Sequence, residues 1–253
     1  DESRYSELSN QVTDVFHIAA QINNIADYDT LKESNVESTR NIIRFCMYSS
    51  MKNLHFMSSV TTTIHHDKDI LYENEYTDSK LLQSGYAQTK WVGEKMCELA
   101  LQKGLPVNVY RTPLIGPSSN GKIFRDDDLI TYFSEMFNLL GIMSKHNQPI
   151  LDIFPCDLLT DIMVEFTCNP NNMGRIYHMR NKYADIEQWF NKLNCDQVEP
   201  NTFKKLCENF NFEKPEHKAL RKLVTNIFME KYSYMDSTNI YKYSSNKFLH
   251  SFS

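Results

Sequence analysis

Residues 84–95 of the chain read SGYAQTKWVGEK, and this stretch places a phenol and an ammonium four residues apart. Residues four apart on a helix lie one above the other, so Tyr86 and Lys90 share a face and can contact one ligand. A free tyrosine titrates near about 10, and a nearby cation favours the phenolate, which brings the hydroxyl closer to the range where it exchanges protons. The stretch therefore predicts a proton donor on a helix.

The surrounding sequence distinguishes this pair from others of the same spacing. The spacing occurs three times, at Tyr28/Lys32, Tyr86/Lys90 and Tyr243/Lys247. Upstream of the middle pair, apolar residues 54–57 run into two serines, as a buried strand ending in hydroxyls would. Ligands of open α/β sheets bind at the carboxyl ends of strands, so the second serine, Ser59, is predicted to converge with Tyr86 and Lys90. Downstream, apolar residues at helical spacing continue to Gly104, which ends the predicted helix.

Several separated segments of the chain resemble the extended short-chain dehydrogenase/reductases. Within that family, the resemblance is to the thioester reductase domains that end nonribosomal peptide synthetases and aminoadipate reductases. The segments are residues 17–20 (HIAA), 35–39 (NVEST), 58–59 (SS), 85–94 (GYAQTKWVGE), 110–113 (YRTP), 120–121 (NG) with 127–128 (DD), and 155–157 (PCD). The block at 85–94 is the most specific of these and separates thioester reductases from sugar-nucleotide epimerases.

The resemblance implies an α/β fold, a doubly wound parallel sheet of the Rossmann-like, extended reductase type. It assigns residues 1–180 to an NAD(P)-binding domain and residues 181–253 to a C-terminal helical substrate-binding cap. Such sheets open with a glycine-rich turn that holds the cofactor pyrophosphate, yet no glycine precedes Gly85. We therefore expect a sheet that lacks its first strands, either as a fragment or through genuine loss, and weak NADPH or NADH binding by this chain alone.

The functional residues of the family transfer to matching positions of this chain. The implied catalytic residues are Asn35, Ser59, Tyr86 and Lys90. The implied contacts to an NADPH or NADH cofactor are His17, Ala19, Ala20, Tyr86, Lys90, Thr112 and Pro113. Structural alternatives exist, because a lone histidine such as His17 is common in protein cores and an asparagine such as Asn35 often caps a helix. At residues 111–113, Arg-Thr-Pro replaces the Arg-Pro of the family.

The implied site suits reduction of a carbonyl group. Tyr86 is expected to supply a proton, Ser59 a hydrogen bond and Lys90 a positive charge to an oxygen that becomes negative. The predicted function is NAD(P)H-dependent reduction of an acyl thioester, on a carrier protein or on CoA, to an aldehyde or alcohol. Fatty acyl-CoA reduction and sugar-nucleotide epimerisation are alternatives on the same fold. An inactive binding or scaffold module is the alternative from a different class.

Composition argues against other classes of partner. The 253 residues are 41% hydrophobic, enough for one substantial core with a small appended subdomain. The net charge is −5 without a basic stripe, which argues against nucleic acid, and no apolar run reaches the roughly 20 residues that span a bilayer. Six cysteines without a C-x-x-C pair predict reduced thiols in a cytoplasmic protein.

Several polar segments receive structural rather than metal-binding interpretations, and no metal is expected. Residues 60–83 are predicted to form an exposed loop that serves as a lid or docking surface. The adjacent histidines at 65 and 66 lack further ligands at zinc-like spacing. The three aspartates at 126–128 are predicted to complement the dipole of the helix that follows them, and Asp157 is predicted to cap a helix over 158–166.

Overall fold

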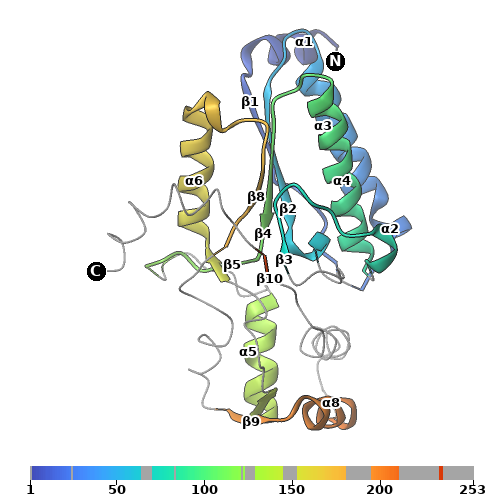
Figure 1. Cartoon of the computed structure of the whole chain (residues 1–253), viewed down its shortest axis with the longest axis vertical. Helices are drawn as coiled ribbons and strands as arrows, with labels where there is room; N and C mark the ends of the chain where they lie inside the picture. Colours follow the sequence, from blue (N-terminus) through green and yellow to red (C-terminus); the bar gives the residue numbers. More distant parts are fainter. Residues whose placement is uncertain are drawn as a thin grey trace. The chain divides into compact units, whose positions relative to one another are not determined.

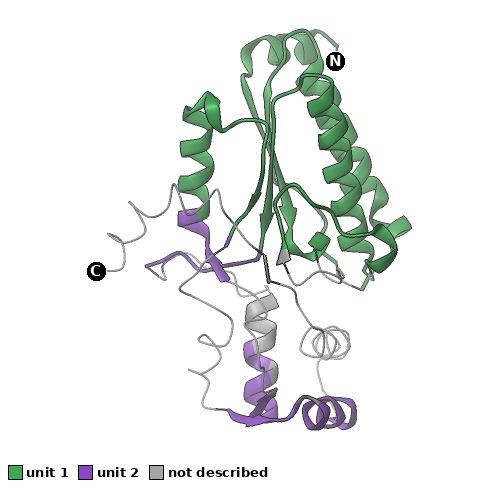
Figure 2. Ribbon diagram, in the orientation of Figure 1, with its two compact units in different colours: residues 1–112, 159–179, 233–253 green, residues 113–158, 180–232 purple. Residues whose placement is uncertain are grey.

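The computed structural model describes residues 2–23, 25–63, 70–82, 84–120, 122, 129–144, 153–180, 195–210 and 234–235. The chain divides into two compact units, which are coloured separately in Figure 2. Unit 1 comprises residues 1–112, 159–179 and 233–253, and unit 2 comprises residues 113–158 and 180–232. The four predicted catalytic residues all belong to unit 1.

A parallel four-stranded sheet forms the centre of unit 1 (Figure 1). Its strands are β1 (Asp14–His17), β2 (Asn53–Ser59), β4 (Val107–Thr112) and β8 (Ile176–His178), in the order β1-β2-β4-β8. Ser58 of β2 lies opposite Arg111 of β4, and Ser59 lies opposite Thr112. The predicted α/β fold with a parallel sheet is confirmed, and β2 and β4 end side by side.

Helices cover both faces of this sheet, with α3 and α4 on one face and α6 on the other (Figure 1). The helical segments are α1 (Glu2–Gln11), α2 (Tyr28–Lys32), the π-helical turn η1 (Glu33–Glu37), α3 (Ser38–Met47), α4 (Gly85–Gln102), α6 (Cys156–Cys168), and the 3₁₀ turns η2 (Val60–Thr63), η3 (Ser79–Leu81) and η4 (Pro170–Asn172). A short parallel pair joins β3 (Ile70–Leu71) to β10 (Tyr234–Met235). Every residue of β4 is buried, as expected for a parallel strand covered on both faces.

The two faces of the sheet carry different cores, because successive side chains of a strand point to opposite faces. A mainly aliphatic core lies on the face of α4 and comprises Cys46, Leu54, Phe56, Cys97, Ala100, Leu105, Val107 and Val109. On the other face, aromatic rings stack from strand to strand. The ring centroids lie 4.5 Å apart from Phe16 to His55, 6.0 Å from His55 to Tyr110 and 5.7 Å from Tyr110 to Tyr177.

Helix α4 begins and ends where its sequence predicts. The Ser84 hydroxyl accepts a hydrogen bond from the Ala87 backbone N–H at 3.1 Å, and Gly104, with a φ of 92°, takes the left-handed conformation after the last turn. Gly93 allows close packing on the sheet, since a Cβ there would lie 2.7 Å from the Phe56 ring. The helix therefore rests directly on β2.

The described part of residues 60–83 is partly buried and does not form the exposed loop that its polar composition predicts. Among the described residues of this segment, Thr62, Leu71, Thr77 and Leu82 are buried. The indole N–H of Trp91 donates to the Thr77 carbonyl at 3.0 Å, which fastens the segment to α4. The Thr62 hydroxyl likewise donates to the Glu94 carboxylate of α4, so contacts with α4 that composition does not reveal hold part of this segment. The histidines at 65 and 66 lie outside the described residues.

Unit 2 contains short parallel strand pairs and helices. Its elements are β5 (Leu114–Gly116), α5 (Leu129–Leu140), β6 (Ile142–Ser144), β7 (Ile153–Pro155), β9 (Asp196–Val198) and α8 (Pro200–Asn209), with β5 beside β7 and β6 beside β9. Phe137 of α5 packs on Phe203 of α8 with ring centroids 5.8 Å apart. Of the predicted cap at 181–253, only residues 195–210 and 234–235 are described, and the aspartates at 126–128 also lie outside the described residues.

Asp157 lies one residue inside the helix that it was predicted to cap. Helix α6 starts one residue earlier, at Cys156, and the Asp157 carboxylate accepts hydrogen bonds from the Ser119 backbone N–H at 2.9 Å and the Ser119 hydroxyl at 2.5 Å. Partial burial opposes ionisation, but hydrogen bonds from Ser119 and from the backbone N–H groups of Leu158 and Asp157 hold the pKa of Asp157 below its usual value. The carboxylate therefore fastens the loop after β5 to the start of α6.

Two general expectations concern the whole chain. Within the described ranges, no helix combines the length and the apolar character needed to cross a bilayer. All six cysteines lie in those ranges, and each is a free thiol.

Candidate active site

Tyr86 and Lys90 lie in the first turns of α4, against the end of β2. The Lys90 ammonium donates a hydrogen bond to the Met57 carbonyl of β2 at 2.8 Å. It also lies 5.1 Å from the centroid of the Phe56 ring, which gives a buried cation–π contact. Lys90 is only 4% exposed and Tyr86 only 8%, so both groups are withdrawn from bulk water.

Ser59 is the last residue of β2, as the sequence predicts, and lies two residues beyond Met57. Its side chain is half-buried, and its oxygen accepts hydrogen bonds from the Thr61 hydroxyl at 3.0 Å and the Thr61 backbone N–H at 3.3 Å. Because the Ser59 hydroxyl accepts both of these bonds, its own proton stays available for another acceptor. The strand end therefore presents a hydrogen-bond donor beside α4.

Burial determines the acid–base properties of this pair. Desolvation raises the pKa of Tyr86 to about 12, opposite to the direction that the Tyr-x-x-x-Lys spacing predicts. The reason is that the phenolate would be buried, while the Lys90 ammonium is bonded to the Met57 carbonyl. Desolvation also lowers the pKa of Lys90 to about 8, partly opposed by the charge of Glu94. At neutral pH the site therefore holds a neutral phenol and a mainly charged ammonium.

Asn35 lies inside a helix and does not cap one, because the helix begins at Tyr28, where Asp27 accepts a hydrogen bond from the Thr30 backbone N–H at 2.9 Å. Asn35 is buried within the π-helical turn η1. Its amide donates to the Thr89 hydroxyl of α4 at 3.1 Å. The Asn35 amide therefore contacts the residue next to Lys90 in α4.

His17 closes β1 as a buried, neutral histidine. Its Nε2 lies 2.9 Å from the Thr39 hydroxyl, which is itself 2.6 Å from the Asn35 carbonyl. Since a carbonyl can only accept, Thr39 gives its proton to Asn35 and accepts one from His17, which assigns the Nε2–H tautomer. Burial and, secondarily, the Lys90 charge lower the pKa of His17 to about 4. These contacts support the core role for His17 and leave its cofactor contact a prediction.

The remaining predicted cofactor residues lie at strand ends. Ala19 is exposed and Ala20 half-buried just past β1, so their small side chains leave the strand tip accessible. Thr112, the last residue of β4, donates through its hydroxyl to the Ser58 carbonyl at 3.0 Å, which joins β4 to β2. Pro113 begins unit 2. The cofactor contacts of these residues stay predictions.

The structure shows a buried ion pair beside the site that the sequence did not predict. In the sequence, Glu94 was only part of the 85–94 block that carries the family resemblance. Glu94 and Arg111 are both fully buried, and the guanidinium donates from Nη2 and Nε to Oε2 at 2.8 and 3.0 Å. Arg111 Nη1 also lies 3.0 Å from His178 Nε2, which must accept because a guanidinium has no lone pair. The sequence feature that could have pointed to Glu94 is its position, because it follows Lys90 by one helical turn and so lies on the same face of the helix.

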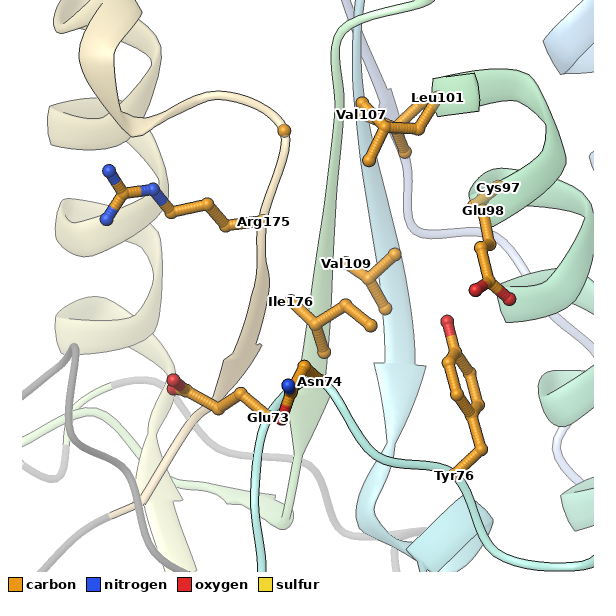
Figure 3. Close-up of a pocket in the computed structure, with 11 residues that line it drawn as sticks. Glu73, Asn74, Tyr76, Cys97, Glu98, Leu101, Val107, Val109, Arg175 and Ile176 are labelled. Atoms are coloured by element: carbon orange, nitrogen blue, oxygen red, sulfur yellow. The ribbon is translucent and has the colours of Figure 1, made fainter. Parts of the chain in front are cut away.

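A separate cavity of about 340 Å³ lies along the second half of α4, over β4 and β8 (Figure 3). Its walls include Cys97, Leu101, Val109 and Ile176. The Tyr76 hydroxyl points toward Glu98 at one side of it, and this hydroxyl is buried without a hydrogen-bond partner among the described residues. The cavity is distinct from the Tyr86–Lys90 pair, which lies in the first turns of the helix.

Comparison with known proteins identifies the family. Residues 1–163 match a family of NAD-binding domains described as male sterility protein. Among curated relatives, the chain is 29% identical over 213 residues to the nonribosomal peptide synthetase asaC of Aspergillus flavus, covering 76% of this chain and 20% of the relative. It is 24% identical over 195 residues to the aldehyde reductase lnbA of the same organism, covering 71% of this chain and 19% of the relative. The chain thus spans about a fifth of the length of these relatives.

Solved structures support the fold. The terminal R domain of the myxalamid PKS-NRPS biosynthetic pathway matches with a TM-score of 0.82 at 22% identity, covering 98% of this chain and 66% of that one. The aureusimine biosynthetic cluster reductase domain matches with a TM-score of 0.69 at 16% identity, covering 92% of this chain and 62% of that one. At these identities the likeness concerns architecture, while the family match covers well over half of the sequence. The chain belongs to the male sterility protein family of NAD-binding domains.

Proposed function

We propose that this chain is the reductase part of a protein that uses NADPH or NADH to reduce an acyl thioester to an aldehyde or alcohol. One observation carries the proposal: Lys90, one helical turn after Tyr86, is bonded to Met57 near the end of the strand that Ser59 closes. This arrangement supplies a proton donor, a cation and a hydroxyl at a strand end. Family membership and the relatives named as a peptide synthetase and an aldehyde reductase support the same chemistry.

The residues present fit one end of a nicotinamide cofactor. The exposed Ala19 at the tip of β1 leaves room for a flat ring, and Lys90 supplies an ammonium donor for ribose hydroxyls. Tyr86 lies on the same face of α4 as Lys90 and completes this set. When bound, a reduced nicotinamide supplies hydride to the substrate carbonyl carbon. The glycine-rich turn that usually holds the pyrophosphate has no counterpart in these 253 residues, where Gly85 is the first glycine.

Each residue of the site has a separate task as charge develops on the substrate oxygen. Tyr86, with a pKa near about 12, holds its proton at neutral pH and acts as an acid toward that oxygen. The free proton of Ser59 gives the same oxygen a second hydrogen bond. Lys90 keeps positive charge close by, where low solvent access strengthens its effect.

The substrate class follows from what a thioester becomes under this chemistry. Hydride on carbon and the Tyr86 proton on oxygen give a hemithioacetal, which expels a thiol and leaves an aldehyde. A second round of the same steps gives an alcohol. We propose that the thiol belongs to the phosphopantetheine arm of a carrier protein, with CoA as the rival donor. The peptide synthetase relative and a solved thiolation-reductase di-domain of the same fold support the carrier.

Cofactor oxidation with matched substrate panels tests the proposal. The protein that carries this chain is supplied with NADPH and, in parallel, with an acyl thioester on a carrier protein, the same acyl group on CoA, or a UDP-sugar. We expect oxidation with the thioesters, faster with the carrier, and none with the UDP-sugar. A folded protein that binds NADPH but does not oxidise it in the presence of any of the thioesters would overturn the proposal and favour a binding module.

A further inference from the structure

We propose that Glu94 is a positioning residue of the catalytic site, which fixes the turn that presents Ser59 and keeps Lys90 charged. The inference goes beyond the proposed function and rests on it only in taking Lys90 as the catalytic cation. Glu94 lies one helical turn after Lys90 on α4 and is fully buried. Its carboxylate is shared among β2, η2 and β4, which is more than a single structural ion pair requires.

The first group of contacts is with the end of β2. The Ser58 hydroxyl donates to Oε1 of Glu94, and the Thr62 hydroxyl donates to the same oxygen at 2.9 Å. Ser58 and Thr62 flank the turn that starts at Ser59, and Thr62 shares its single hydroxyl proton between Glu94 and the Ser59 carbonyl, which lies 2.8 Å away. One carboxylate oxygen therefore holds both sides of the turn, so that the direction of the Ser59 hydroxyl depends on Glu94.

The second group of contacts fixes the carboxylate itself. Arg111 donates to both oxygens of Glu94, and Arg111 lies opposite Ser58 in the register of β4 and β2. A guanidinium that binds both oxygens of a carboxylate fixes its orientation as well as its position. The guanidinium is held in turn by His178 of β8. Glu94 therefore connects α4 directly to the ends of β2 and β4, and through Arg111 to the end of β8.

The third relationship is with the charge of Lys90. Burial lowers the pKa of Lys90, and the Glu94 charge opposes that effect. The other titratable groups facing Lys90 carry no negative charge at neutral pH. Burial keeps His17 of β1 uncharged by lowering its pKa, and burial raises the pKa values of the Tyr86 hydroxyl and the Cys97 thiol. Among the described residues, Glu94 is the anion that keeps this buried ammonium protonated.

Titration of Lys90 in a charge-removing variant tests the proposal. Glu94→Gln keeps the shape of the side chain, and heteronuclear NMR of lysine-labelled protein follows the Lys90 Nζ shift against pH, with assignment from Lys90→Arg. We expect the pKa of Lys90 to fall by about one pH unit below that of the parent. Glu98→Gln is the matched control, because Glu98 lies one turn further along α4 and pairs with Lys95. It should leave the pKa of Lys90 unchanged.

A second variant keeps the test decisive if Glu94→Gln does not fold. Removal of one partner from a buried ion pair leaves the other uncompensated, whereas neutral replacement of both is often tolerated. In Glu94→Gln/Arg111→Met we expect a smaller fall in the pKa of Lys90, because the positive charge of Arg111 is removed together with the negative charge of Glu94. An unchanged pKa of Lys90 in a folded variant of either kind overturns the proposal. The titration contains neither cofactor nor substrate, so its failure is distinguishable from failure of the proposed function.

Discussion

The side-chain amide of Asn35 donates a hydrogen bond to the Thr89 hydroxyl at 3.1 Å, which joins the π-helical turn η1 to the residue beside Lys90. The same side chain accepts from the Gln21 backbone N–H at 2.8 Å and donates to the Gln21 carbonyl at 3.1 Å. Asn35 therefore connects the segment after β1 with the helix that carries the proton donor. Single π-helical turns inside α-helices occur frequently at functional sites, and this one directs the amide into the site.

Removal of the Asn35 amide should destabilise the fold as well as loosen the site. Asn35→Ala removes the buried amide that bonds the Thr89 hydroxyl and both backbone groups of Gln21, so we expect a loss of about 1–3 kcal/mol in the free energy of unfolding. Denaturant titration of parent and variant measures it. Asn10→Ala is the control, because the exposed Asn10 accepts only a surface hydrogen bond from Ser49 and should change stability by less than about 0.5 kcal/mol. Equal losses of unfolding free energy in the two variants would contradict this structural role of Asn35.

Loss of the Tyr86 hydroxyl should abolish most turnover while cofactor binding stays nearly intact. Tyr86→Phe removes the proton donor and only one of several predicted cofactor contacts, whereas general acid catalysis is worth about 10²- to 10⁴-fold. Steady-state rates with a carrier-bound thioester and calorimetric binding of NADPH measure the two effects. Tyr28→Phe shares the four-residue spacing to a lysine but lies on α2, and it should behave like the parent. A Tyr86→Phe protein with half the parental rate would rule out this assignment.

Close packing of α4 on β2 should make Gly93 intolerant of a side chain. Gly93→Ala places a methyl group 2.7 Å from the Phe56 ring, which is itself buried. Overpacking of this kind costs about 1–3 kcal/mol of stability, measurable by thermal or denaturant unfolding. Phe56→Leu removes the ring, so the double variant should lose less than the sum of the single variants. If the stability losses of the two single variants simply add in the double variant, the methyl group does not clash with the Phe56 ring and the prediction is wrong.

Stability should decrease as the pH falls through the range in which His17 titrates. Burial and the Lys90 charge lower the pKa of His17 to about 4 in the folded chain. Because the unfolded value is about 6.5, the unfolded state binds more protons between these limits, and stability falls as pH decreases from about 6.5 to about 4. In His17→Gln this contribution, at most about 1.4 kcal/mol per pH unit, should disappear from the slope of unfolding free energy against pH. A variant slope as steep as that of the parent would contradict the assignment.

Local pattern was enough to predict the elements that position the site. The serine-tipped strand β2 and the helix that carries Tyr86 each have local signals, an apolar run that ends in serines and an apolar spacing that ends at Gly104. Those signals depend on neighbouring residues only, so they can be read from one sequence. The parallel direction of the strands was predicted from the family resemblance, which implies a doubly wound parallel sheet.

What the sequence could not supply depends on packing between distant residues. The partners of Glu94 lie 17 and more residues away, and no local pattern brings Arg111 and Ser58 to one carboxylate. The pKa of Tyr86 was expected to fall because spacing reveals the nearby Lys90, whereas burial, which raises it, appears only in the folded chain. No residue pattern predicts the π-helical turn η1 either, so a helix cap stayed open as the structural alternative for Asn35.

Transfer of hydrogen from labelled cofactor tests the central claim most directly. The protein that carries this chain is incubated with an acyl thioester on a carrier protein and NADPH that bears deuterium at the transferable position. We predict an aldehyde or alcohol with deuterium on the former carbonyl carbon, and release of the carrier thiol in equal amount. Intact thioester, in a folded protein shown to bind NADPH, would contradict the account.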